Sequence, residues 1–578
     1  GSLQIKNAGV SAGGPVTISA HSPLIISSPI TITAPGAALT LSASESIAVD
    51  ALITTAGGDV SLTAGEDITV ADPVVANGGR IDLVAGRDVT LGVLVTSGAA
   101  FVLAATGSIA AVDESVLSSS VWLEAAGDIG SLLQPISTQA TLVGADSSGG
   151  SVWIDAGDVT IGGVDRTGAT PSAALSAKAT AELNAAGALT VAAPVSAHDV
   201  SLSAGGLLQV TAAGPITTTA SITLDGGSVS LTGATLNGGS LAITAELGDI
   251  DVSASTLKAS GTSSLVAAGT LAVVGSTLDG AEIDTSAPAI SIAKSSLVVP
   301  NTGSKVDLLA EAYDLNLTAA TISAPTIDGT ATHGNVLVEG GGTINATVDL
   351  DFEAGVGVIA DSGVVHAGGQ LTLDGKAGDV TLGGAALSGD LSVLLTAPKG
   401  SVHLDSGTLG GGTTTIHAGG GDLILDGSLL TVSAITADAS GNIQLSAGSV
   451  KTTGDAAFTP GGMLNANGTT IEADGLVDFA AGGSISLTGG SVSAGTGIHA
   501  GAGDTLTAGG TPLQTSGGTI ALDAHTDLAL SGSTIEAGTQ LGATSGSVTG
   551  TAGGNVRLET GAIAVRDDAT FAAGGALD

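Results

Sequence analysis

The chain is built from short apolar–x–apolar triplets separated by small and polar residues. Triplets begin at Leu39, Val60 and Ile81, and a second triplet follows each one after about eight residues, as at Ile47 and Ile68. In an extended strand, the outer two side chains of a triplet point to one face and the middle one to the other. Gly, Ala, Ser, Asn and Asp fill the gaps and permit tight turns. The pattern therefore predicts many short β-strands and no helix.

The triplets recur at a nearly constant interval along the chain. In the N-terminal half the step is about 20–21 residues, with a third apolar pair such as Val74 and Val75 in many copies, and a similar step returns after Val380. One coil of three short strands cannot bury its own core, but stacked coils can. We therefore predict an all-β fold: a single elongated, right-handed parallel β-helix, continuous over residues 1–578. The right hand is expected from the chirality of parallel crossovers.

Two steps in the N-terminal half are longer than the others. The intervals from Val121 to Val152 and from Val152 to Ala181 each exceed the usual step by about ten residues. Extra residues in a solenoid coil map to loops that leave the stack. We predict protruding insertions at 131–150 and 162–180.

Composition narrows the classes of function. The chain has 91 Gly in 578 residues, only 1% aromatic residues and no Cys, so its core must consist of small aliphatic side chains without disulfides or thiolate metal sites. Its formal net charge of −40 opposes binding to nucleic acid and to anionic membranes. No apolar run is long enough for a membrane helix. We expect a monomer with no nucleic-acid partner and no membrane insertion.

The two tryptophans of the chain stand in near-copies of one phrase, "SVWLEAAGDIG" and "SVWIDAGDVTIG". Trp122 and Trp153 occupy the middle of their triplets, so both side chains should point outward. If the phrases begin successive coils, the two indoles lie one above the other and form an aromatic platform for a glycan or protein partner. Alternatively, the predicted insertions fold over the pair as a small satellite core that contains Leu132, Leu133, Ile136 and Leu142.

A row of acidic residues is the second candidate site. Asp67, Asp88, Asp128 and Asp158 each stand just before the second strand of a coil. Stacked carboxylates about 5 Å apart repel one another unless water or a cation screens them, which suggests weak Ca²⁺ binding. Alternatively, each carboxylate caps a turn by accepting a backbone N–H. We expect no other cofactor.

No catalytic site is predicted. The eight His residues are scattered over different repeat positions, and no G-x-S-x-G nucleophile motif with a plausible His and acid is present. An enzyme acting on acidic polysaccharides is an alternative, since β-helices also host such enzymes, but the few Arg residues stand beside no obvious acidic constellation. We therefore expect that the protein is not an enzyme.

Three phrases resemble the repeats of filamentous haemagglutinins: "LTAGEDITV" (62–70), "LVAGRDVTLG" (83–92) and "AGDVTLGG" (377–384). These are large exoproteins of the two-partner secretion pathway of Gram-negative bacteria. The resemblance implies a right-handed β-helical shaft, export through a dedicated outer-membrane transporter, and a secreted or cell-surface location. It also implies a role in adhesion, biofilm cohesion or contact-dependent inhibition. The "NPNG" element of the family's secretion domain does not occur, so the resemblance is to the shaft.

The leading interpretation is a rigid stalk segment of a bacterial surface adhesin or biofilm-matrix exoprotein. Its exterior would contact a host or bacterial surface glycan or protein, or a matrix polysaccharide. Two alternatives share the solenoid: the stalk of a contact-dependent inhibition exoprotein and the passenger of an autotransporter.

Overall fold

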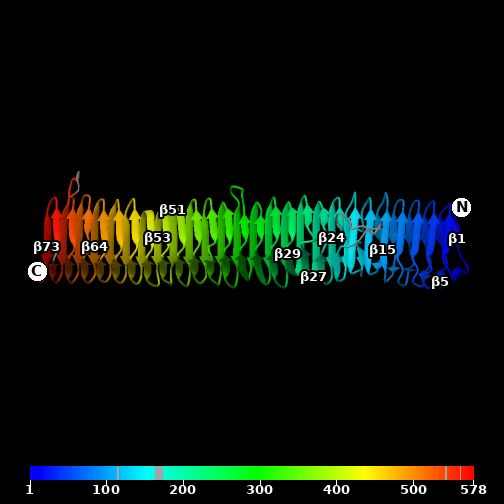
Figure 1. Cartoon of the computed structure of the whole chain (residues 1–578), viewed down its shortest axis with the longest axis horizontal. Helices are drawn as coiled ribbons and strands as arrows, with labels where there is room; N and C mark the ends of the chain where they lie inside the picture. Colours follow the sequence, from blue (N-terminus) through cyan, green and yellow to red (C-terminus); the bar gives the residue numbers. More distant parts are fainter. Residues whose placement is uncertain (113–115, 163–173, 540–542, 560) are drawn as a thin grey trace. The chain divides into compact units, whose positions relative to one another are not determined.

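The computed structural model describes residues 1–112, 116–162, 174–539, 543–559 and 561–578. In these residues it contains strands, bridges, turns and bends, and no helix. The chain divides into two units, Gly1–Ala281 (unit 1) and Glu282–Asp578 (unit 2). Within each unit, strands of successive coils lie side by side and pair in parallel (Figure 1). The predicted all-β parallel solenoid is confirmed.

Three coils of unit 1 show the arrangement that the triplets predict. The long first strands are β6 (Leu39–Ala43), β9 (Val60–Ala64) and β12 (Ile81–Ala85). The second strands are β7 (Ile47–Val49), β10 (Ile68–Val70) and β13 (Val89–Leu91). The third strands are β8 (Ile53–Thr55), β11 (Val74–Val75) and β14 (Leu94–Val95). Each set forms one column, because a strand pairs with its equivalent in the next coil.

The core of unit 1 is a set of aliphatic ladders. Leu39 is in register with Val60, and Val60 with Ile81, and all three side chains are fully buried. Inward and outward residues alternate along each strand, as in the burial of β9 at positions one, three and five. Stacking identical positions at about 4.8 Å places one branched side chain on the next and leaves little space for aromatic residues.

Unit 2 repeats the same plan. Two successive coils are formed by β58 (Ala456–Pro460), β59 (Leu464–Asn467), β60 (Thr470–Ala473), β61 (Leu476–Ala481), β62 (Ile485–Thr488) and β63 (Ser491–Ala494). Its inward aromatic rings are accommodated in two ways. Phe458 and Phe479 stack with ring centroids 5.7 Å apart. Phe352 instead lies opposite Gly329, where a Cβ atom would overlap the phenyl ring.

The columns of unit 1 exchange partners between residues 120 and 185. The first strand β18 (Ser120–Ala125) pairs with β20 (Leu142–Ser147), and not with the strand of the second Trp phrase, β21 (Val152–Ala156). That strand continues the second-strand column, through the bridge between Ile129 and Val152. It then pairs with β24 (Thr180–Ala185). The interval from the first phrase to the second is therefore more than one coil.

This exchange corrects the prediction of a protruding insertion at 131–150. Most of that range forms coil strands: β19 (Ile136–Thr138) pairs with β21, and β20 pairs with β18. Only the turn closed between Ser131 and Gln134 projects, and its Leu132 and Leu133 are 69% and 92% exposed. Of the second predicted insertion, 162–180, residues 163–173 lie outside the described residues. Its end forms β23 (Leu175–Ala177) and the start of β24.

Candidate functional site

Trp122 lies on the outward face of β18 but is not exposed. Its neighbours Val121 and Leu123 point to the core, so the alternation predicted from the sequence is present, yet the indole is only 4% exposed. Its register partners are Phe101 and Gly144, and a Cβ atom at Gly144 would overlap the indole ring. The missing side chain of Gly144 is therefore the space into which Trp122 packs.

A cation completes this aromatic cluster. The guanidinium carbon of Arg80 lies 4.0 Å from the centroid of the Phe101 ring, and Phe101 is itself buried. Cation–π contacts of this kind stabilise a packed surface cluster. The prediction that Trp122 forms part of an exposed platform is wrong, because its indole is covered on the face where the sequence places it.

Trp153 lies in a different column. It is half-buried, its register partner is Glu182 of β24, and its backbone N–H donates to the carbonyl oxygen of Ile129 at 2.8 Å. The predicted pair of adjacent indoles is therefore wrong, because Trp122 and Trp153 occupy different columns. The satellite-core alternative also fails for Leu132 and Leu133, whose side chains face solvent.

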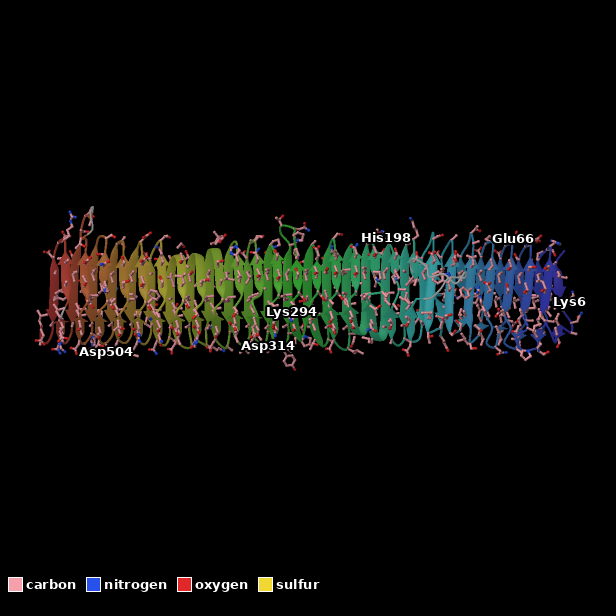
Figure 2. All side chains as sticks on the ribbon, viewed as in Figure 1. Lys6, Glu66, His198, Lys294, Asp314 and Asp504 are labelled. Carbon is pink, nitrogen blue, oxygen red and sulfur yellow. The ribbon has the colours of Figure 1, made fainter. Side chains whose placement is uncertain are left out.

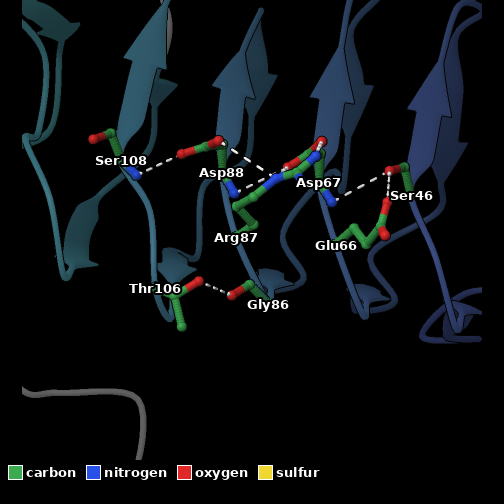
Figure 3. Close-up of polar contacts among 8 residues, drawn as sticks. All are labelled: Ser46, Glu66, Asp67, Gly86, Arg87, Asp88, Thr106 and Ser108. Atoms are coloured by element: carbon green, nitrogen blue, oxygen red, sulfur yellow. Dashed lines mark hydrogen bonds and ion pairs between the residues drawn. The ribbon is translucent and has the colours of Figure 1, made fainter.

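The predicted aspartate row is a ladder of backbone caps (Figure 3). The backbone N–H of Asp88 donates to Oδ1 of Asp67 at 3.2 Å, and the N–H of Ser108 donates to Oδ1 of Asp88 at 2.8 Å. The N–H of Asp128 donates to Oγ of Ser108 at 3.0 Å. Each side chain thus accepts the N–H of the equivalent residue one coil further on. The carboxylates satisfy backbone donors at the strand ends.

Asp158 does not belong to this row. The carboxylate of Asp128 accepts the N–H of Ser151 at 2.8 Å, and Asp158 accepts the N–H of Ala188 at 2.7 Å in a separate column. The exchange of columns is the reason, since it continues the row that contains Asp67 into Ser151, the first residue of the second Trp phrase. The prediction of one shared row of four aspartates is therefore wrong.

Arg87 neutralises one member of the row. Its Nε donates to Oδ1 of Asp67 at 2.8 Å, and a second guanidinium N–H donates to Oδ2 (Figure 3). This side-chain bond holds the pKa of Asp67 below its usual range, against a smaller opposing effect of burial. In turn, the bond to Asp67 raises the pKa of Arg87 still further. Among the described residues, no group of three His, Asp or Glu side chains is placed to hold a metal ion.

The capping ladder recurs in unit 2, where it explains why a Gly precedes the capped residue. The N–H of Asn442 donates to Oδ1 of Asp422 at 2.6 Å, and the N–H of Met463 donates to Oδ1 of Asn442 at 2.8 Å. A Cβ atom at Gly441 would overlap that same carboxylate oxygen of Asp422. Gly441 and Gly462, which precede the capped residues Asn442 and Met463, are therefore required by the close approach of the previous coil. Sequence reasoning treated these Gly residues only as turn formers.

Two His–Asp pairs were not predicted. His417 Nδ1 lies 2.5 Å from Asp438 Oδ2, and His499 Nδ1 lies 2.7 Å from Asp478 Oδ1. Both pairs join register partners on adjacent coils at the exterior. They could have been found only by aligning residues about 21 apart. Their arrangement is that of hydrogen-bonded cross-strand pairs on the surface of neighbouring coils.

Charged side chains lie on the exterior along both units (Figure 2). No helix in the described ranges has the length and apolarity needed to cross a membrane.

Residues 405–561 match the hemagglutinin repeat. The matched region lies in unit 2 and includes the coils formed by β58 to β63 and the capping ladder at Asp422. The resemblance to filamentous haemagglutinins predicted from the repeat phrases is confirmed over this range. No curated protein matches the chain. The hemagglutinin repeat is a structural element of adhesin-type shafts, and this together with the solenoid supports an adhesin-like shaft.

Proposed function

We propose that the chain is a rigid, non-enzymatic stalk segment of a secreted surface adhesin of a Gram-negative bacterium. The observation that carries the proposal is the coil-to-coil register of parallel strands in each unit, combined with the hemagglutinin repeat at 405–561. A stalk of this kind holds a recognition surface away from the cell.

The architecture suits a mechanical role. Backbone hydrogen bonds between coils run along the direction of stacking, so a pulling force loads many of them in the same direction. Aliphatic ladders such as Leu39, Val60 and Ile81 and the capping ladder at Asp422 add cohesion without disulfides. The net charge of −40 opposes lateral aggregation of neighbouring stalks.

The export route and the partners belong to the same proposal. A chain without Cys can pass unfolded through an outer-membrane transporter of the two-partner type. Folding outside the cell then needs no oxidising enzyme. The exterior of the solenoid is the surface available to host or bacterial glycans, proteins or matrix polysaccharide.

Negative-stain electron microscopy of the purified chain tests the stalk. We expect uniform rods on the order of 130 Å long, from rungs of about 4.8 Å. Compact multi-lobed particles would overturn the proposal. An assay of reducing ends after incubation with polygalacturonate tests the non-enzymatic part, for which we expect no release above that of heat-denatured protein.

A further inference from the structure

A groove in unit 1 lies along the edge between the third and first strands. It has a volume of about 610 Å³, and Val95 of β14 and Leu117 of β17 (Val116–Leu117) contribute to its apolar surface. These two residues are register partners at half-buried, outward-facing positions. The floor is therefore a short aliphatic strip that crosses neighbouring coils.

A polar row borders this strip. Asn77, Ser97, Ser119 and Gln139 line the groove, and all four are exposed. Asn77, Ser97 and Ser119 stand at the same place, two residues after the third strand of their coils, at intervals of about 4.8 Å. Gln139 takes the register position of Leu117 one coil further on and closes the end of the strip with an amide.

Some of these side chains are held in place. Nδ2 of Asn77 donates to the carbonyl oxygen of Thr55 at 3.0 Å, and Oγ of Ser119 donates to the carbonyl oxygen of Gly98 at 2.8 Å. An amide and a hydroxyl each have more donors and acceptors than one such bond uses. Asn77 and Ser119 are therefore preorganised and can still bond to a ligand, which lowers the entropic cost of binding.

The groove carries no ionic side chain among the described residues that line it, although the chain has a net charge of −40. A ligand without charge meets neither an attracting cation nor a repelling carboxylate among these described lining residues. An acidic ligand would be repelled by the surrounding protein. A peptide strand could not add to the sheet here, since the backbone groups of β14 and β17 already pair with neighbouring coils.

We propose that this groove binds a linear, neutral oligosaccharide. A pyranose chain presents apolar C–H faces and hydroxyl edges in regular alternation, which matches an aliphatic floor beside a repeated amide and hydroxyl row. The coils from Asn77 to Gln139 accommodate about three to four sugar units at roughly one unit per rung. This inference rests on the proposed function and deepens it, because it names the ligand class and the surface that an adhesin-like exterior would use.

Isothermal titration calorimetry with the full chain tests the groove. The probes are neutral cello-, malto- and chito-oligosaccharides of four units, with an oligogalacturonate as the acidic comparison. We expect at least one neutral probe to bind with a dissociation constant on the order of 0.1–1 mM, and the acidic probe to give no heat. Absence of heat with every neutral probe, or equal binding of the acidic one, overturns the proposal.

Two variants and a control locate the binding. Leu117→Asp places a carboxylate in the floor and is expected to weaken binding at least 10-fold, and Ser97→Lys, at an exposed border position, is expected to weaken it at least 3-fold without disturbing the core. The control Leu429→Asp makes the same change on the 49%-exposed Leu429 of β55 (Leu429–Ala439) in unit 2 and should leave binding unchanged. Unaltered affinity in Ser97→Lys and Leu117→Asp variants that melt like the parent would contradict the assignment.

Microscopy and calorimetry test the stalk and the groove independently. Rods in the microscope without oligosaccharide binding refute the groove and leave the stalk intact. Binding by a chain that forms no rods refutes the stalk and leaves the groove.

Discussion

The stability of unit 2 should rise in mild acid because of one aspartate ladder. Asp284, Asp307, Asp328 and Asp351 are successive register partners on adjacent coils. Their strands are β37 (Glu282–Ala287), β40 (Lys305–Ala310), β43 (Thr326–Ala331) and β46 (Leu350–Ala354). Lys305 Nζ lies 2.6 Å from Oδ2 of Asp307 and compensates that member directly. The row thus concentrates four carboxylates on rungs about 4.8 Å apart.

The pKa shifts in this row set the sign of the effect. Partial burial, followed by neighbouring carboxylates, raises the pKa of Asp284, Asp328 and Asp351, and Lys305 and Lys376 oppose the shift. A folded-state pKa above the unfolded value of about 3.9 means that folding favours the protonated form. The stabilisation that comes from protonating these three carboxyl groups is therefore fully present below about pH 4. It is lost as the pH rises through their folded-state pKa values.

Other charged groups on the same face belong to this balance. Glu282 and Asp349 raise the pKa of Asp284 and Asp328, respectively. Further carboxylates and one lysine face Asp351: Asp328, Glu353, Asp374 and Lys376.

Unit 1 contains groups with the opposite sign. Side-chain hydrogen bonds from Arg87 and Ser221 hold the pKa of Asp67 and Asp199, respectively, below the usual range. Their stabilisation is present above the unfolded pKa of about 3.9 and is lost as the pH falls through the folded-state values. Acid should therefore loosen the coils around Asp67 and tighten those around Asp328.

The substitution Asp328→Asn isolates the repulsion. It removes one charge between Asp307 and Asp351, each about 5 Å away, and each repulsion is worth about 0.8 kcal/mol in a water-like dielectric. Lys305 already offsets part of the interaction with Asp307. We expect a net stabilisation of about 0.5–1.4 kcal/mol at pH 7 and low salt, less at 0.1 M salt, and none at pH 3.

Hydrogen exchange followed by mass spectrometry measures this effect locally, which suits a fold whose coils open in parts. At pH 7, Asp328→Asn should slow exchange about 2- to 10-fold in β40, β43 and β46. The control is Asp478→Asn, which removes the partner of His499 instead of a repelling neighbour and should not slow exchange. If Asp328→Asn leaves exchange unchanged or accelerates it at pH 7, or if the difference persists at pH 3, the electrostatic reasoning is wrong.

Three further predictions concern packing, capping and metal. Gly144→Val should destabilise unit 1 by about 1–3 kcal/mol, because the added side chain overlaps the indole of Trp122. In a Trp153→Phe background, the fluorescence emission of Trp122 should also shift to the red. An unchanged spectrum and melting curve would contradict this packing. Asp422→Ala should cost about 1–2 kcal/mol, because the N–H of Asn442 loses its acceptor, whereas Asp422→Asn should restore most of the loss in thermal melts. Neither millimolar Ca²⁺ nor a chelator should shift the melting curve, because the capping carboxylates already accept backbone donors. A rise in melting temperature with Ca²⁺ would contradict this prediction and support calcium binding.

The coil and its register could be predicted because they depend on local chemistry. Strand alternation fixes which side chains face inward, and a constant step fixes which residues stack, so Leu39, Val60 and Ile81 fall in one ladder as the spacing predicts. The inward Phe352 fits because its partner on the neighbouring coil is Gly329, a match that appears only when the two positions are aligned.

The Trp site could not be predicted in the same way. An apolar triplet fits any of the three columns of a coil, so the similarity of the phrases around Trp122 and Trp153 does not say which column each enters. The bridge between Ile129 and Val152 decides it, and that pairing depends on the path of the backbone through the turn at Ser131. Burial of Trp122 likewise depends on the missing side chain of Gly144, one coil away.

Because columns can exchange partners, the exterior of this protein must be compared column by column. The row that begins with Asp67 and Asp88 passes through Asp128 to Ser151, whose Oγ then accepts the N–H of Thr180 at 3.2 Å. One continuous surface row therefore combines residues from two different places in the repeat. The same exchange limits the neutral groove. The lining of the groove follows the third-strand column as far as Gln139, just after β19, and at the next coil that column merges into β21. The length of ligand that this surface can hold is thus set by where the backbone changes column, and not by the number of repeats in the sequence.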